Sequence, residues 1–298
     1  MMKETKLRKI FNIVNVLLIT LLCVIMVYPY LNQLATAFND SLDTSVGGLT
    51  IYPRVFTLDN FKTVFVNSQV RVGLLISSSR TIIATLLSLL VTYMAAYALS
   101  NKRLKGRKGI NVFLSIPMYL TAGTIPIFIL YRYLGLINNY MVYILPGVFS
   151  FYNMLIIRSS LEDIPEAIEE SAKLDGANEF IIMTRIMIPM TLPVIATVTL
   201  WLAVGYWNDW MTTMYYITKP DLYSLQYVMM QIVKQAEAAA KMAAEQVQGA
   251  VSADKKTMVT SESVQAAVLI VATTPILIVY PFLQRYFISG VTLGAVKG

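Results

Sequence analysis

Two of the side chains that often carry catalytic chemistry, histidine and cysteine, are almost missing from this chain. Its 298 residues include no histidine and a single cysteine, Cys23. Without imidazole there is no Ser-His-Asp triad and no histidine-ligated zinc. One cysteine forms neither an intrachain disulfide nor a CxxC metal or redox motif. We therefore expect no metal and no cofactor, and an enzyme is the least favoured functional class.

One segment gathers the side chains that suit sugar binding. All three tryptophans of the chain lie there, with amide and carboxylate groups among them. The candidates are Trp201, Tyr206, Trp207, Asn208, Asp209 and Trp210, with Asn153 as a further residue. Aromatic faces and hydrogen-bonding groups together are compatible with a sugar path. The alternative is an aromatic belt at the membrane surface. Asp209 favours the path, because an acid at membrane depth usually faces a cavity or a partner.

The second informative segment is residues 158–189, which hold seven acidic residues. The pattern predicts two short helices. Asp163 is placed to cap the first, with Pro165 in its opening turn, and Gly176 is placed to end it. The second is expected from about residue 178 to 187, ended by Pro189. The first helix is too short to form a core alone, so it is expected to enter a groove on a partner.

Composition sets the class of protein that must position these segments. Hydrophobic residues make up 56% of the chain and charged residues 14%, with a mean hydropathy of +0.61. Six segments approach the roughly 20 apolar residues that cross a bilayer as a helix, which predicts an all-α integral membrane protein. The expected spans are Ile10–Tyr30, Val72–Leu99, Ile110–Tyr131, Tyr140–Ile157, the stretch from Pro189 to Met214, and Val264–Leu283. Arg80 lies inside the second span and needs an acidic or carbonyl partner, for which a second subunit is one source.

Basic residues predict the orientation of these spans. The net charge is +7, and the short link 101–109 holds five bases and no acid. Such links stay in the cytoplasm, which places both termini and the loop 158–189 there. No aromatic residues interleave with the basic clusters, so nucleic-acid binding is not expected. Bases before the first span and Ala35-Thr36-Ala37 after it outline a signal peptide, but the long apolar run favours an uncleaved anchor.

The long segment 218–262 is expected on the opposite, extracytoplasmic side. From about residue 222 to 248 it should be helical, with an apolar stripe that includes Leu225 and Val228. Packing against the spans is one interpretation of this stripe. Contact with a binding protein is the other.

The loop 158–189 carries a motif with a defined spacing. Glu170-Ser171-Ala172 is followed after three residues by Gly176, and after nine more by Ile186-Met187-Ile188-Pro189. This resembles the cytoplasmic EAA loop of inner-membrane permeases of binding-protein-dependent ABC importers: Glu-Ala-Ala, three residues, Gly, nine residues, Ile-x-Leu-Pro. Ser171 and Ile188 are the departures, and both conserve size. The tail, residues 285–298, is similar to that of the smaller permease subunit of maltose-type importers.

The resemblance implies a type I importer permease fold and a division of the chain. Residues 1–70 would form an anchor helix and an extracytoplasmic segment, 71–284 the permease domain, and 285–298 a cytoplasmic tail. It also implies four kinds of partner: a second permease subunit, a cytoplasmic ATPase dimer, an extracytoplasmic solute-binding protein and the membrane lipid. The chain has no GxxxxGK[ST] sequence, so ATP hydrolysis is expected in the partner.

For the cargo, the resemblance implies an oligosaccharide carried by alternating access. Amino acids, peptides or phosphate are the alternative within the same class of importer. The residues implied to couple to the ATPase are Glu170, Ser171, Ala172, Asp175 and Gly176. Glu170 would pair with a basic group of the ATPase, and the small residues would permit close approach.

Overall fold

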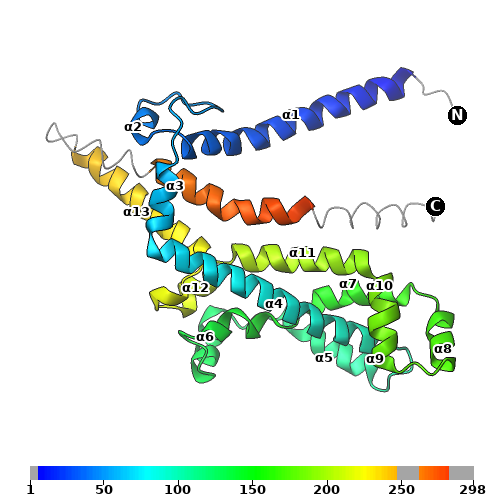
Figure 1. Cartoon of the computed structure of the whole chain (residues 1–298). Helices are drawn as coiled ribbons and strands as arrows, with labels where there is room; N and C mark the ends of the chain where they lie inside the picture. The colour runs from blue at the N-terminus through cyan, green and yellow to red at the C-terminus, as the bar shows by residue number, and fades with distance from the viewer. Residues whose placement is uncertain (1–5, 247–261, 282–298) are drawn as a thin grey trace. The chain divides into compact units, whose positions relative to one another are not determined.

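The protein is almost entirely helical in the computed structural model, which describes residues 6–246 and 262–281 (Figure 1). Apolar runs form helices because every backbone polar group must be paired inside lipid. The elements are α1 (Lys6–Ala37), α2 (Ser41–Thr44), α3 (Asp59–Val66), α4 (Ser68–Ser100), α5 (Arg107–Tyr119), α6 (Thr124–Tyr133), η1 (Tyr140–Tyr143), η2 (Leu145–Gly147), α7 (Phe151–Glu162), α8 (Glu166–Leu174), α9 (Glu179–Ile181), η3 (Ile182–Met187), α10 (Ile188–Met190), α11 (Leu192–Asn208), α12 (Met211–Tyr216), η4 (Pro220–Leu222), α13 (Leu225–Gln246) and the helix Glu262–Pro281.

The prediction of six spans is confirmed, but only three of them are unbroken helices: α1, α4 and the helix Glu262–Pro281. The other three spans are bent pairs. The pair α5 and α6 bends by 115°, the segment 140–147 and α7 by 45°, and the helix 179–190 and α11 by 84°. The 115° bend follows from Gly123, whose φ of 85° places it outside the helical region just before α6. Three of the expected single helices are therefore wrong in detail.

The chain divides into two compact units, residues 1–70 with 229–274 and residues 71–228 with 275–298. In the first unit, the Asn60 side chain stabilises the end of α1. Its Nδ2 donates to the carbonyls of Ala37 and Asn39, at 3.0 and 2.8 Å. Asp40 caps α2 by accepting from the backbone of Leu42 and Asp43. The predicted tail, 285–298, and the end of the sixth span lie outside the described residues.

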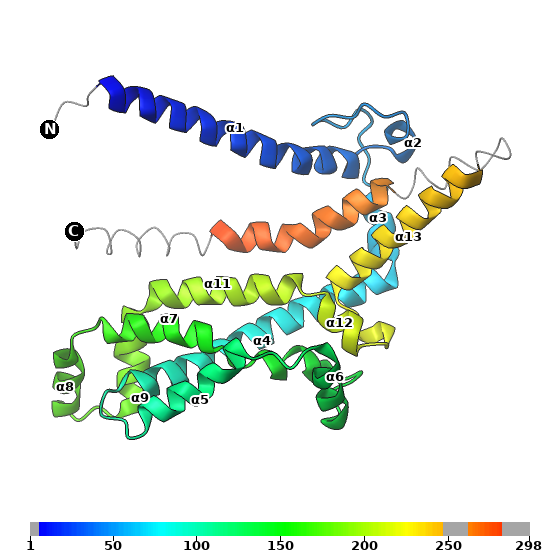
Figure 2. The same ribbon diagram turned by 180° about the vertical axis from the view of Figure 1, so that it is seen from behind.

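In the second unit, α4, α7, α8, η3 and α11 share one hydrophobic core. Tyr93 of α4, Ile157 of α7 and Val198 of α11 are all buried in it. Figures 1 and 2 show α7 and α11 side by side in views from opposite directions. This core joins the predicted coupling loop, 158–189, to the spans.

A buried charge lies in the first half of α4. Arg80 is only 1% exposed, and it donates from Nη2 to the backbone carbonyl of Asp209. Its Nη1 lies 3.5 Å from the Asp209 carboxylate, and the guanidinium carbon lies 4.9 Å from the centre of the Tyr143 ring. Both an acidic and a carbonyl partner expected for Arg80 therefore lie in this chain, whereas its buried Nε has no hydrogen-bond partner among the described residues.

Hydrogen bonds extend from this charge to the start of α13. The Tyr143 hydroxyl donates to the Leu222 carbonyl at 2.7 Å and hydrogen-bonds with Thr213, which hydrogen-bonds with Ser224. The backbone N–H of Leu225 donates to Ser77 of α4 at 2.9 Å. Gly73 makes this approach close, because a Cβ there would lie 3.0 Å from the Leu225 backbone.

The buried pair predicts non-additive stability. Asp209→Leu leaves the Arg80 charge without its carboxylate, and breaking a buried pair costs about 3–5 kcal/mol. Arg80→Met removes the buried charge and leaves Asp209, whose side chain is 30% exposed. We expect the Asp209→Leu protein to melt at the lower temperature in detergent, and the double variant to recover most of that loss. Asp221→Leu, at an exposed acid of η4, is the matched control. A double variant that melts below both single variants would contradict this.

Candidate functional site

The first helix of the loop 158–189 ends in a Schellman motif at Gly176. The N–H of Gly176 donates to the Lys173 carbonyl at 3.1 Å, and the N–H of Ala177 to the Ala172 carbonyl at 3.0 Å. Gly176 has a φ of 82°, which glycine adopts without strain. The predicted end of the helix at Gly176 is therefore confirmed.

The predicted start of this helix is wrong in one respect. Pro165 occupies the N-cap of α8 and no side chain caps that end. Asp163 instead ends α7, with its N–H donating to the Ser159 carbonyl at 3.2 Å. The chain between α7 and α8 is too short for Asp163 to serve both helices. Glu166 and Glu169 lie in the first turn of α8, where they complement the helix dipole.

The second helix of the loop begins as predicted and ends later. Asn178 caps α9 by accepting from the Ile181 N–H at 2.9 Å. The helix then passes through the π-helical turn η3 into α10, and the chain bends at Thr191 rather than at Pro189. Pro189 is tolerated because it lies in the first turn of α10, and Thr191 Oγ1 donates back to the Met187 carbonyl at 2.7 Å.

The predicted coupling residues divide between two faces. Glu170, Ser171, Asp175 and Gly176 are exposed, whereas Ala172 is buried in the chain's own core, which includes Met183 and Met187. Ala172 therefore permits close packing inside this chain and does not face outward.

Two large apolar side chains of the loop are more than half exposed. Leu174 is 90% exposed and Phe180 68% exposed, on either side of the turn at Gly176. Sequence patterns alone did not indicate a role for Phe180; its position two residues after the Asn178 cap was the available signal. Exposed apolar residues beside a rigid turn suit the binding of a partner.

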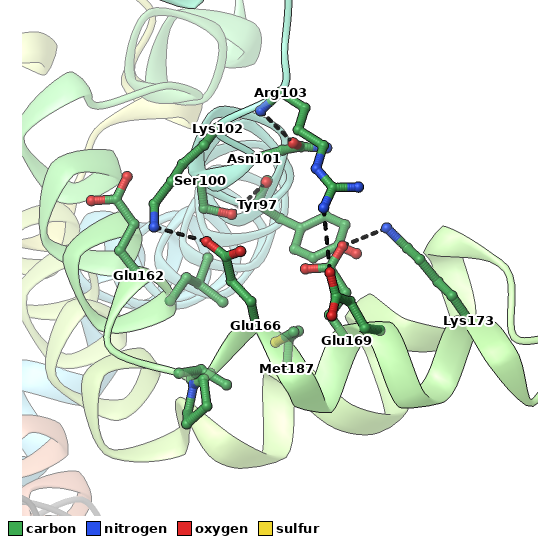
Figure 3. A pocket seen from close by; sticks show the side chains of 14 residues that line it. Tyr97, Ser100, Asn101, Lys102, Arg103, Glu162, Glu166, Glu169, Lys173 and Met187 are labelled. Carbon is green, nitrogen blue, oxygen red and sulfur yellow. Dashed lines mark hydrogen bonds and ion pairs between the residues drawn. The ribbon is translucent and has the colours of Figure 1, made fainter.

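Charged side chains line a cleft of about 120 Å³ between α8 and the end of α4 (Figure 3). Lys102 Nζ lies 2.8 Å from Glu166, and Arg103 Nη2 lies 3.3 Å from Glu170. Lys173 bridges Glu169 and Glu179 at 2.6 and 2.9 Å. Figure 3 shows Lys102 and Glu166 pointing toward one another across the cleft. Glu170, expected to meet a base on a partner, thus already lies beside Arg103.

The ion pair between Lys102 and Glu166 shifts the pKa of both partners. The hydrogen bond from Lys102 lowers the pKa of Glu166 below 4.5, and the same bond raises the pKa of Lys102 above 10.5. The stabilisation of the fold by ionised Glu166 is present above its unfolded pKa and is lost as pH falls through the lowered pKa. The stabilisation of the fold by protonated Lys102 is present below its unfolded pKa and is lost as pH rises through the raised pKa. The pair therefore persists across neutral pH.

The predicted path residues do not form one continuous face. Trp207 is buried, and the Tyr206 hydroxyl donates to the Gly147 carbonyl at 2.8 Å. Trp201 is 48% exposed and stacks on Tyr152 with ring centres 6.5 Å apart. The remaining members are as follows: Asn208 accepts from Gln226 at 3.5 Å, Asp209 pairs with Arg80, Trp210 is half-buried and Asn153 is 8% exposed.

The described residues contain no group of three or more acidic or cysteine side chains that could hold a metal. Arranged as it is, the loop offers a surface for docking, and the second unit offers buried polar networks between spans.

Comparison with known proteins assigns the family. Residues 88–293 match the family described as binding-protein-dependent transport system inner membrane component. Protein LplC of Bacillus subtilis is 33% identical over 100% of this chain and 98% of its own length. The polygalacturonan/rhamnogalacturonan transport system permease protein YtcP of B. subtilis is 33% identical over 95% of each chain.

A solved structure shares both the fold and part of the sequence. It is a chain of a bacterial ABC transporter involved in the import of the acidic polysaccharide alginate, with a TM-score of 0.82 and 26% identity. The match covers 95% of this chain and 99% of that one. The expected permease fold is confirmed, and the chain belongs to the family of inner membrane components of binding-protein-dependent transport systems.

Proposed function

We propose that this chain is the permease subunit of an ATP-driven importer of oligosaccharides. The observation that carries the proposal is the complete EAA spacing on a helix–turn–helix whose Glu170, Leu174 and Phe180 are exposed around the Gly176 turn. The names of two relatives, which describe the transport of polygalacturonan/rhamnogalacturonan and of galactooligosaccharides, support a sugar cargo.

The importer would contain four further components beside this chain. We infer one second permease subunit, two copies of a cytoplasmic ATPase and an extracytoplasmic solute-binding protein, assembled in the cytoplasmic membrane. The basic link 101–109 supports an orientation with both termini and the loop 158–189 in the cytoplasm. The helix α13 would then lie on the opposite side, where it is available to the binding protein.

Coupling would begin at α8. The ATPase groove would receive the exposed face of α8 and the turn at Gly176, with Leu174 and Phe180 as apolar anchors. Closure of the ATPase dimer on ATP would carry the loop with it, and the core shared with α4, α7 and α11 would pass the displacement to the spans. Two arrangements of the spans would alternate in this way between inward- and outward-facing states.

For the sugar path, the stacked pair of Trp201 and Tyr152 is the strongest candidate. Its aromatic faces are exposed, which a pyranose ring requires. Trp207 and Tyr206 are held inside the chain by burial and by the Gly147 hydrogen bond, so they would shape the wall of the path. Asp209 would act through Arg80 and the end of α11.

Reconstituted transport tests the assignment of cargo. We expect the complete importer in proteoliposomes to take up an oligosaccharide supplied with its binding protein, and to hydrolyse ATP faster when both are present. A panel of oligogalacturonides, galactooligosaccharides and maltodextrins, with amino acids and peptides as the contrasting set, measures the class. Stimulation by a member of the contrasting set alone would replace the sugar assignment.

A pair of substitutions at one position tests the docking turn. Gly176→Val places a β-branched residue at positive φ, which costs about 1–2 kcal/mol of backbone strain, whereas Gly176→Asn is tolerated there. A Cβ at this position meets nothing within 4 Å inside the chain, so any steric effect must come from a partner or from strain. We expect the valine variant to lose ATPase co-purification or stimulated hydrolysis while both permease subunits still assemble. The asparagine variant should retain both, and equal activity of the two variants would argue against this turn as the coupling element.

A further inference from the structure

Apolar packing alone anchors α8 weakly. Ala172 is the one buried residue among its nine, and Leu174 at its end is 90% exposed. Isolated helices shorter than about 12 residues are marginal in water. The direction in which α8 points must therefore depend on the groups beside it, and those groups are charged.

Two bases from a single loop meet one face of α8. Lys102 and Arg103 lie two and three residues after the end of α4, and their partners Glu166 and Glu170 lie four residues apart, on the same side of α8. Tyr97, near the end of α4, adds a third contact by donating to Glu179 at 2.7 Å. The end of α4 therefore contacts both helices of the loop 158–189.

Arg107 links the end of α4 to the end of α7. Its Nε donates to the carbonyl of Leu99, in the last turn of α4, at 2.7 Å, and its Nη2 pairs with Glu162 at the end of α7. Arg158 also approaches Glu162, at 3.3 Å, and donates to Asn111 of α5 at 2.8 Å. A planar guanidinium serves two acceptors at once, which joins α4, α5 and α7 at one point.

We propose that three basic residues after α4 position the coupling helix, with Lys102 and Arg103 setting the direction of α8 and Arg107 linking α4 to α7. Lys102, Arg103 and Arg107 would thus belong to the coupling apparatus without touching the ATPase. The proposal rests on the proposed role of α8 in coupling.

The strength of the contacts matches such a role. The Lys102 and Glu166 side chains are each 66% exposed, and exposed pairs are individually weak. Arg107 and Glu162 are 23% and 31% exposed, so that contact is less screened by solvent. The loop therefore combines one firm attachment with two that can yield when α8 is displaced.

Exchange of charges between Lys102 and Glu166 tests the proposal in the full importer. We expect Lys102→Glu and Glu166→Lys each to lower binding-protein-stimulated ATP hydrolysis by roughly twofold to tenfold, because attraction becomes like-charge repulsion. The double variant restores the opposite charges and should recover most of the rate. Co-purification of both permease subunits with the ATPase measures assembly in every variant.

Lys105→Glu is the matched control. It changes the charge of the same loop by the same amount, and Lys105 takes part in no ion pair among the described residues. We expect it to hydrolyse ATP at the wild-type rate. Equal defects in the Lys105 and Lys102 variants, or a double variant as slow as the single ones, would overturn the proposal.

The wild-type importer separates this proposal from the one on which it rests. If the wild-type complex hydrolyses ATP on stimulation and the Lys102 and Glu166 variants match it, the positioning role fails and the permease role stands. If the wild-type complex itself shows no stimulation, the proposed function fails, and the positioning role of the loop fails with it.

Discussion

The burial of the Arg80 guanidinium is the constraint on which the arrangement of the second unit depends. A charge this far from water needs opposite charge and acceptors around it. The Asp209 carbonyl that accepts from Arg80 lies just past Asn208, the last residue of α11, where the backbone leaves the helix. The break in the helix before α12 and the position of the Tyr143 ring both place groups against the Arg80 guanidinium. The hydrogen bonds through Thr213 and Ser224 carry that order to the first residue of α13.

The opposite end of α4 is organised by different physics. There the charged side chains just beyond α4 are exposed, so their pairs are weak and screened, and the fixed geometry comes from the Schellman motif at Gly176 and the Asn178 cap. Ala96 and Leu99, in the last turns of α4, nevertheless stay buried in the hydrophobic core. α4 thus has a desolvated ion pair at Arg80 and solvated ion pairs just after its last residue.

Local chemistry was predictable from the sequence, and pairings between distant residues were not. Gly176, the Asn178 region and the apolar spans carry their own signals, because positive φ, capping and hydrophobicity act within a few residues. The partners of Arg80 and Lys102 lie 129 and 64 residues away in sequence, and no short-range pattern indicates them. The inward direction of Ala172 likewise depends on the core that packs against α8, including Met183 and Met187.

The close contact at Gly73, which has no side chain, also constrains the length of α4. About seven helical turns separate the Gly73 contact with Leu225 from the Tyr97 contact with Glu179, and both require a particular face of α4. Inserting or deleting one residue between them would rotate one contact by about 100° relative to the other. Relatives that keep both contacts can therefore change the length of this helix only by steps close to whole turns, so α4 should tolerate substitutions far more readily than insertions.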